Sequence, residues 1–121
     1  MSGILNRMLN KIRKHKDFSK AGMILIHNGI VRKTTRDGKR VKGLKVEVNW
    51  DKVNKIIEEN KKRKGIIDII VEIIENKELK VGEDIMYILV AGDIRDNVIP
   101  VLEDVLNDIK SKATKKEQYF I

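Results

Sequence analysis

The sequence of 121 residues contains no cysteine and few aromatic side chains, and each absence excludes a class of function. Without cysteine there is no disulfide, no thiolate metal site and no cysteine nucleophile, so if sulfur chemistry takes place here, another molecule must supply the sulfur. Aromatic residues make up 4% of the chain, and no base-stacking motif interleaves with the charges. No apolar run approaches the roughly 18 residues of a membrane helix. Charges follow the N-terminal apolar patch, unlike in a secretory signal, and we expect a cytoplasmic protein.

The common catalytic signatures are also missing. The sequence has no phosphate loop, no Gly-x-Gly-x-x-Gly and no His-Glu-x-x-His. The two histidines, His15 and His27, do not have metal-ligand spacing. We interpret His15, within a basic run, as a solvated surface residue, and His27, in the middle of an apolar run, as structural. We therefore expect neither a metal nor a cofactor.

The feature present in excess is positive charge, with a net value of +8. It is unevenly distributed: residues 1–46 hold 13 Lys and Arg against 2 Asp and Glu, residues 47–108 hold 9 against 15, and residues 109–121 hold 4 against 1. Such asymmetry predicts a face that meets an anionic partner. A nucleic acid, a phosphorylated small molecule and an acidic protein all fit this description.

Hydrophobic periodicity predicts one α+β domain over residues 1–121, with a mostly antiparallel sheet flanked by helices. Asp37-Gly38 predicts a hairpin turn between the first two strands. Ser2 is a candidate helix cap, and Pro100 predicts that the last helix begins later than Arg95. The expected elements are a basic N-terminal helix within 1–20, strands at 22–32, 41–48, 66–74 and 85–91, a helix starting at Asn49 or Asp51 and ending before Gly65, a helix reaching Ile109, and a short C-terminal tail at 115–121.

Several cations lie where predicted elements end. Arg32 ends the first strand, Arg95 follows the fourth, and Lys115 and Lys116 follow the last helix. The ends of strands and helices commonly present side chains to ligands. Arginine binds phosphate with a planar fork, and a lysine partly desolvated beside other cations has a lowered pKa and can act as a base or nucleophile. These residues are candidates for an anion site.

Three segments, in order, resemble the large, catalytic subunit of molybdopterin synthase. The stretch "AGMILIHNGIVRKTTRDGKRVKGLKVEV" is similar to the family's opening strand, Gly-Ala-x-x-x-Phe-x-Gly-x-Val-Arg, with its charged loop and return strand. "ENKELKVGEDIMYILVAGDIR" and "IKSKATKKEQ" resemble its Gly-x-Leu-x-x-Gly-Asp/Glu stretch and its Trp-Lys-Lys/Arg-Glu motif. The residues that match are Gly22, Gly29, Val31, Arg32, Leu44, Glu47, Leu79, Gly82, Glu83, Arg95, Lys115, Lys116 and Glu117.

The resemblance implies an α/β-hammerhead fold and a homodimer within a heterotetramer. It further implies that each copy binds a small ubiquitin-like subunit whose C-terminal thiocarboxylate supplies sulfur to cyclic pyranopterin monophosphate, in molybdenum cofactor biosynthesis. It also implies that Lys115 is catalytic, that Lys116 supports it, and that Arg32 and Arg95 hold substrate. The charged loop residues expected to cover or attract the substrate are Arg36, Lys39 and Arg40.

The chain departs from the family pattern at several positions. Ile94 replaces a histidine, Thr114 replaces a tryptophan, and only four residues follow Glu117. These differences predict a slower enzyme than typical members, or none. Two alternatives therefore stay open: a paralogue that binds a partner or anion without turnover, and a basic nucleic-acid-binding module.

Overall fold

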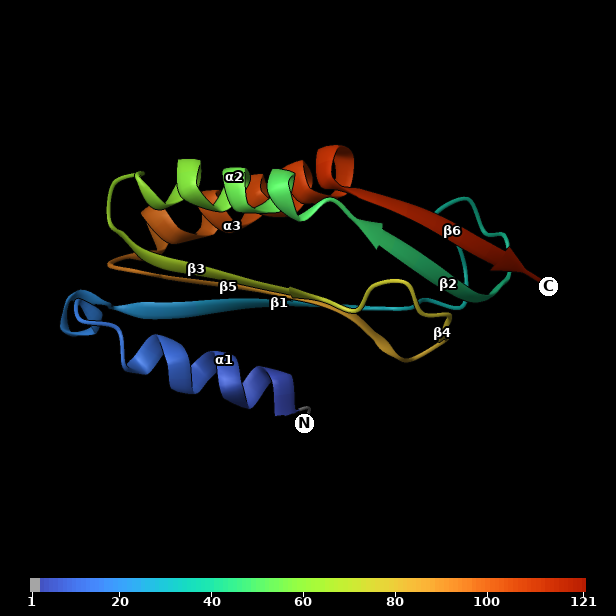
Figure 1. Ribbon diagram of the computed structural model, residues 1–121, viewed down its shortest axis with the longest axis horizontal. Coiled ribbons are helices and arrows are strands. Elements are labelled where there is room, and N and C mark those ends of the chain that lie inside the picture. The colour runs from blue at the N-terminus through green and yellow to red at the C-terminus, as the bar shows by residue number, and fades with distance from the viewer. Residues whose placement is uncertain (1–2) are drawn as a thin grey trace.

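The computed structural model describes residues 3–121, which form two three-stranded antiparallel sheets and three α-helices (Figure 1). The expected cap Ser2 lies outside the described residues. The elements are α1 (Gly3–Arg13), the 3₁₀ turn η1 (Phe18–Lys20), β1 (Met23–Ile30), β2 (Val41–Val48), α2 (Trp50–Lys61), β3 (Ile66–Ile73), β4 (Leu79–Lys80), β5 (Asp84–Gly92), α3 (Arg95–Asp108), the π-helical segment η2 (Ile109–Ala113) and β6 (Thr114–Phe120). The predicted α+β class with mostly antiparallel pairing is confirmed.

The first sheet has the order β1-β5-β3 and is covered on both faces (Figure 1). Helices α2 and α3 pack on one face and α1 on the other, so the sheet lies between two separate apolar clusters. The central strand β5 is buried from Met86 to Gly92. A strand that is buried on both faces has a continuous apolar sequence, and this explains why residues 86–92 of β5 carry no charged side chain.

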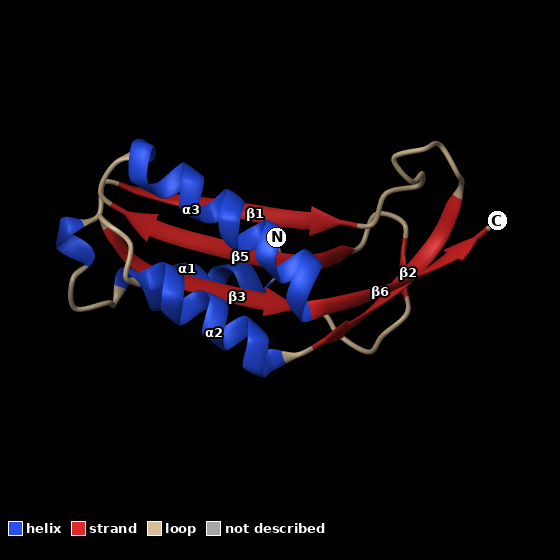
Figure 2. Ribbon diagram, turned by 90° about the horizontal axis from the view of Figure 1, so that it is seen from above, coloured by secondary structure: helices blue, strands red, loops and turns tan. Residues whose placement is uncertain are grey.

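The second sheet has the order β4-β2-β6 and extends beyond one end of the first (Figure 2). The predicted turn is present, with Gly38 at φ 89° and a hydrogen bond from Thr35 N to Lys39 O of 2.8 Å. However, the prediction that this turn joins paired strands is wrong. β1 pairs with β5 and β2 with β6, and only an isolated bridge, Thr34 with Arg40, links the two arms of the loop. The turn signal is local and does not specify the strands' partners.

Two predicted boundaries also differ from the structure. α3 begins at Arg95, so Pro100 lies inside the helix rather than in its first turn. Asp93 Oδ1 accepts hydrogen bonds from Ile94 N (2.7 Å) and Asn97 Nδ2 (2.9 Å), which order the helix start. Pro100 removes only one backbone hydrogen bond there. The segment expected as a short tail is the strand β6, which is ordered by pairing with β2.

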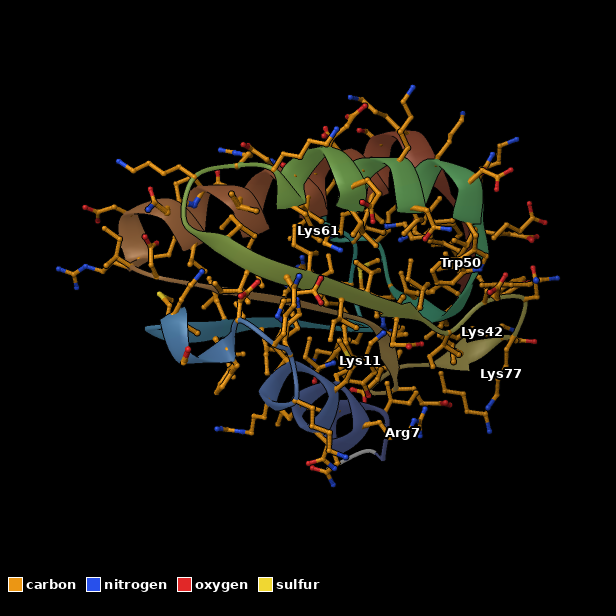
Figure 3. All side chains as sticks on the ribbon, turned by 60° about the vertical axis from the view of Figure 1, so that its left-hand side comes forward. Arg7, Lys11, Lys42, Trp50, Lys61 and Lys77 are labelled. Carbon is orange, nitrogen blue, oxygen red and sulfur yellow. The ribbon has the colours of Figure 1, made fainter. Side chains whose placement is uncertain are left out.

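Other local predictions are confirmed. Asn49 caps α2 by accepting a 3.1 Å hydrogen bond from Lys52 N, and Gly65 follows the helix at φ 79°. Trp50, labelled in Figure 3, donates from Nε1 to Glu75 Oε2 at 2.6 Å and so ties the start of α2 to the end of β3. None of the helices within residues 3–121 is long and apolar enough to cross a membrane.

Candidate anion-binding cleft

A cleft of about 400 Å³ opens where the two sheets separate, between the 31–40 loop, the second sheet and η2. We call it the basic cleft, because four cations and no carboxylate line it: Arg32, Arg36, Lys110 and Lys116. Its apolar wall is formed by Ile30, Val41, Leu44, Val46, Ile85 and Met86. An apolar concavity of this size with a few polar groups is typical of small-molecule sites.

A second hollow continues the basic cleft along β1. Both are lined by Arg32, Met86 and Lys110, and the second adds His27 and Asn28. No carboxylate lines this hollow either. The two hollows therefore make one continuous surface that is positively charged at one end and less charged at the other.

Strand alternation determines which lysine of β6 enters the cleft. Side chains two residues apart share a face of a strand, and Thr114, Lys116 and Gln118 all line the basic cleft. Lys116 lies opposite Val46 of β2, which also lines it. Lys115 is on the other face of β6, opposite Glu47. Lys116 therefore contributes to the cleft and Lys115 does not line it.

Lys110 enters the cleft from η2, the π-helical segment between α3 and β6. Thr114 Oγ1 donates to the carbonyl of Ile109 at 3.2 Å across this wider turn, and π-helical insertions are frequent at functional sites. Partial burial, followed by the positive charges of Lys116 and Arg36, lowers the pKa of Lys110 below its usual value. A larger fraction of this amine is therefore neutral at a given pH than for a solvated lysine.

The two arginines are placed by the loop between β1 and β2. Arg32 follows the buried Val31, whose backbone N–H donates to Glu83 O at 2.9 Å. Arg36 lies nearer the tip, where Thr35 Oγ1 is hydrogen bonded to Asp37 Oδ1. That hydrogen bond is the main cause of the lowered pKa of the Asp37 carboxyl. Asp37 is therefore engaged within its own turn, and Arg36 faces the cleft.

The remaining predicted site residues lie elsewhere in the single chain. Lys39 and Arg40 are exposed on the far arm of the loop and do not line the cleft. Arg95 starts α3 just after Gly92, which pairs with Met23, whereas Arg32 follows the opposite end of β1. About eight strand residues separate these ends, or roughly 25 Å. A role for Arg95 beside Arg32 would require a second copy of the chain.

Sequence reasoning did not name Lys110, which lines the cleft, and interpreted His27, which lines the second hollow, as structural. Lys110 lies four residues after Leu106 of α3, so helical spacing places these two residues on one face. His27 lies two residues from Leu25 and Gly29 on one face of β1. Among residues 3–121, no three His, Asp or Glu side chains gather as a metal site would require.

Comparisons with known proteins agree with this architecture. A family model described as MoaE protein matches residues 5–112. A molybdopterin synthase structure from Staphylococcus aureus superposes with a TM-score of 0.72 at 20% identity, covering 84% of this chain and 77% of that chain. Molybdopterin cofactor biosynthesis protein E from Burkholderia multivorans ATCC 17616 gives 0.75 at 23% identity, covering 93% and 78%.

A further structure, the complex of subunits 1 and 2 of molybdopterin-converting factor from Helicobacter pylori 26695, gives a TM-score of 0.69 at 16% identity, covering 96% of this chain and 82% of that chain. No curated protein matches the sequence. At these identities the structural likeness concerns the fold.

Proposed function

Starting from the fact that the chain belongs to the MoaE protein family, which has a role in molybdenum cofactor biosynthesis, we propose that it is the catalytic large subunit of a molybdopterin synthase. Its substrate is cyclic pyranopterin monophosphate, and its sulfur donor is the thiocarboxylate of a small ubiquitin-like subunit. The observation that carries the proposal is the basic cleft, in which four cations and no carboxylate surround an apolar wall.

The charges of the cleft suit both reactants. The substrate phosphate and the donor thiocarboxylate are anions, and arginine and lysine side chains bind such groups with charge-assisted hydrogen bonds. We assign Arg32, Arg36 and Lys116 to hold the anionic groups. Ile85, Met86 and the neighbouring apolar residues exclude water and accept the flat face of the pterin.

Lys110 is the residue that we assign to the chemistry. Its lowered pKa raises the fraction of neutral amine, the form that can act as a base or nucleophile. Lys116 and Arg36 contribute to this pKa shift. They therefore have two roles in the proposal, since they lower the pKa of Lys110 and also bind the anionic groups of the reactants. The earlier assignment of Lys115 remains a prediction, and the same assay decides between the two lysines.

A small partner subunit and a homodimer complete the proposal. The Helicobacter pylori structure is described as a complex of two subunits, which supports a second subunit for this chain. In a homodimer, a second copy would provide the only route by which Arg95 reaches the basic cleft, given its position at the far end of β1 and β5. The departures at Ile94 and Thr114 predict slower turnover than in typical members.

The test combines binding and turnover. Purified protein is titrated with cyclic pyranopterin monophosphate in a calorimeter, and then incubated with it and a thiocarboxylated small subunit while molybdopterin is measured. We expect binding and product with wild type, and weakened binding with Arg32→Ala. Binding of pterin without turnover would favour the non-catalytic paralogue. Tight binding of RNA or DNA that falls steeply with salt, without pterin binding, would refute the proposal.

A further inference from the structure

His27 occupies an unusual position for a histidine in a buried sheet. On β1, Met23 and Leu25 pack on the cluster beneath α2 and α3, while Ile24 and Ile26 pack toward α1. Alternation puts His27 on the first of these faces. It lies in the middle of β1 and lines the hollow that Lys110 also lines.

The imidazole of His27 lines this hollow, and one of its nitrogens is buried without a hydrogen-bond partner in the part of the chain that the structure describes. Nε2 is inaccessible to solvent and has no hydrogen-bond partner among residues 3–121. Gly29 leaves room for the ring, since a Cβ there would lie 3.3 Å from Nε2. Buried polar atoms in native proteins almost always have a partner, so an orphan atom beside a cleft indicates a group that a ligand completes.

The charge state of His27 is set by its surroundings. Burial, and secondarily the charge of Lys110, lowers the pKa of the imidazole below its ordinary value of 6.5. The charged groups that line the same hollow are Lys110 and Arg32, and the other lining residues are uncharged. The ring is therefore neutral at pH 7, and a neutral imidazole can donate a hydrogen bond from one nitrogen and accept one at the other.

We propose that His27 is a substrate-binding residue of the basic cleft, and that its Nε2 hydrogen bonds the heterocyclic ring of the bound pterin while the cations hold the phosphate. This inference rests on the proposed function and specifies how the ring is recognised. The cations Arg36 and Lys116 line the larger hollow and not the one with His27. A pterin ring carries several hydrogen-bonding edge atoms, which suits a less charged, partly apolar end that also offers the side chains of His27 and Asn28.

The proposal predicts that replacing His27 by phenylalanine lowers the affinity for substrate without lowering the thermal stability of the protein. A histidine kept only for structure would cost stability when replaced, whereas His27→Phe removes an unsatisfied polar atom and keeps a ring of similar shape. Phe is also the residue at this position of the family pattern described above. We expect this variant to be at least as thermally stable as wild type, and to bind cyclic pyranopterin monophosphate about threefold to tenfold more weakly, as expected for one lost hydrogen bond.

Proton linkage gives a second signature. A bound phosphate offsets the charges of Lys110 and Arg32, so the pKa of His27 rises on binding. Near pH 6, binding should therefore take up protons, which is measured by calorimetry in buffers of different ionisation enthalpy. His27→Phe should reduce this uptake, whereas His15→Phe should not, because His15 lies outside the hollow, beside Asp68.

The deciding experiment uses the whole chain and four variants, namely His27→Phe, His27→Gln, His15→Phe and Arg32→Ala. Titrations with cyclic pyranopterin monophosphate and with inorganic phosphate are followed by calorimetry and by NMR of the two imidazoles. We expect His27→Phe to weaken pterin but not phosphate binding, His27→Gln to recover part of the affinity, and the Nε2 resonance of His27 to move further with pterin than with phosphate.

The outcomes separate the two proposals. If wild type binds pterin, Arg32→Ala weakens it and both His27 variants bind like wild type, the role of His27 is refuted and the proposed function stands. If wild type does not bind pterin at all, the proposed function fails and the His27 assignment fails with it. Equal weakening of pterin and phosphate by His27→Phe would also overturn the assignment, because it would place His27 at the anion.

Discussion

Replacing Lys110 is the sharpest test of the site, because Lys115 provides a matched control five residues away. Lys110 lines the basic cleft, whereas Lys115 lies on the opposite face of β6, across from Glu47. A positioned general acid or base contributes about 10²–10⁴-fold to rate. We therefore expect Lys110→Ala to lower the rate of molybdopterin formation by that factor, which corresponds to about 3–5 kcal/mol in the barrier.

The control variants separate the amine from the charge. Lys110→Arg keeps a cation that cannot be deprotonated in a protein, so it should retain much of the pterin affinity and still lose the rate. Lys115→Ala removes one member of an exposed cross-strand pair worth about 0.2–1 kcal/mol, so it should lower the melting temperature by a few degrees at most. Its rate should stay close to that of wild type.

The assay is single-turnover formation of molybdopterin with saturating thiocarboxylated partner, accompanied by a thermal melt of each variant. The reasoning is refuted if Lys110→Ala reacts at the wild-type rate while folded. It is also refuted if Lys115→Ala loses as much activity as Lys110→Ala without loss of stability, which would return the catalytic role to Lys115.

Three further predictions concern pH, packing and assembly. The rate of molybdopterin formation should rise as the pH passes through the lowered pKa of Lys110. Lys116→Gln should move this rise to higher pH, because it removes a cation that favours the neutral amine. An unchanged pH profile in this variant would contradict the coupling between the two lysines. Gly92→Ala should lower the free energy of unfolding by about 1–3 kcal/mol in urea titrations, because a Cβ there would lie 2.6 Å from Val98 Cγ2. An unchanged urea midpoint would show that the backbone moves freely enough to accept the methyl group. A mixture of the Arg95→Ala and Lys110→Ala proteins should be more active than either variant alone if Arg95 of one copy completes the cleft of another. A mixture no more active than the two variants alone would show that Arg95 does not act in the site.

Much of the fold could be predicted from sequence because its signals are local. Continuous apolar runs indicated strands buried on both faces, and Asn49 and Gly65 marked the ends of α2. Strand partners could not be predicted, because Asp37-Gly38 specifies a turn without specifying that β1 and β2 belong to different sheets.

The site was predicted less well than the fold, for a related physical reason. Arg32 and Lys116, which line the cleft, were candidates because they end or follow predicted elements, and Arg36 was a candidate because it belongs to a basic loop. Lys110 has no local feature that distinguishes it from Lys112. Its lowered pKa arises only when the loop that carries Arg36 meets η2 and β6, and that loop is far from these two segments in the sequence.

The separation of β1 and β2 into different sheets also affects how the protein is made. β1 cannot pair before β5 has been synthesised, since Met23 pairs with Gly92. Likewise, β2 cannot pair with β6 until Thr114, the partner of Val48, has been synthesised. Such non-local pairing predicts slow folding, on a scale nearer milliseconds to seconds than microseconds. During synthesis β2 has no long partner within residues 3–121 until β6 has left the ribosome. The basic cleft, which joins Arg32 to Lys116, is therefore among the last features of the molecule to form.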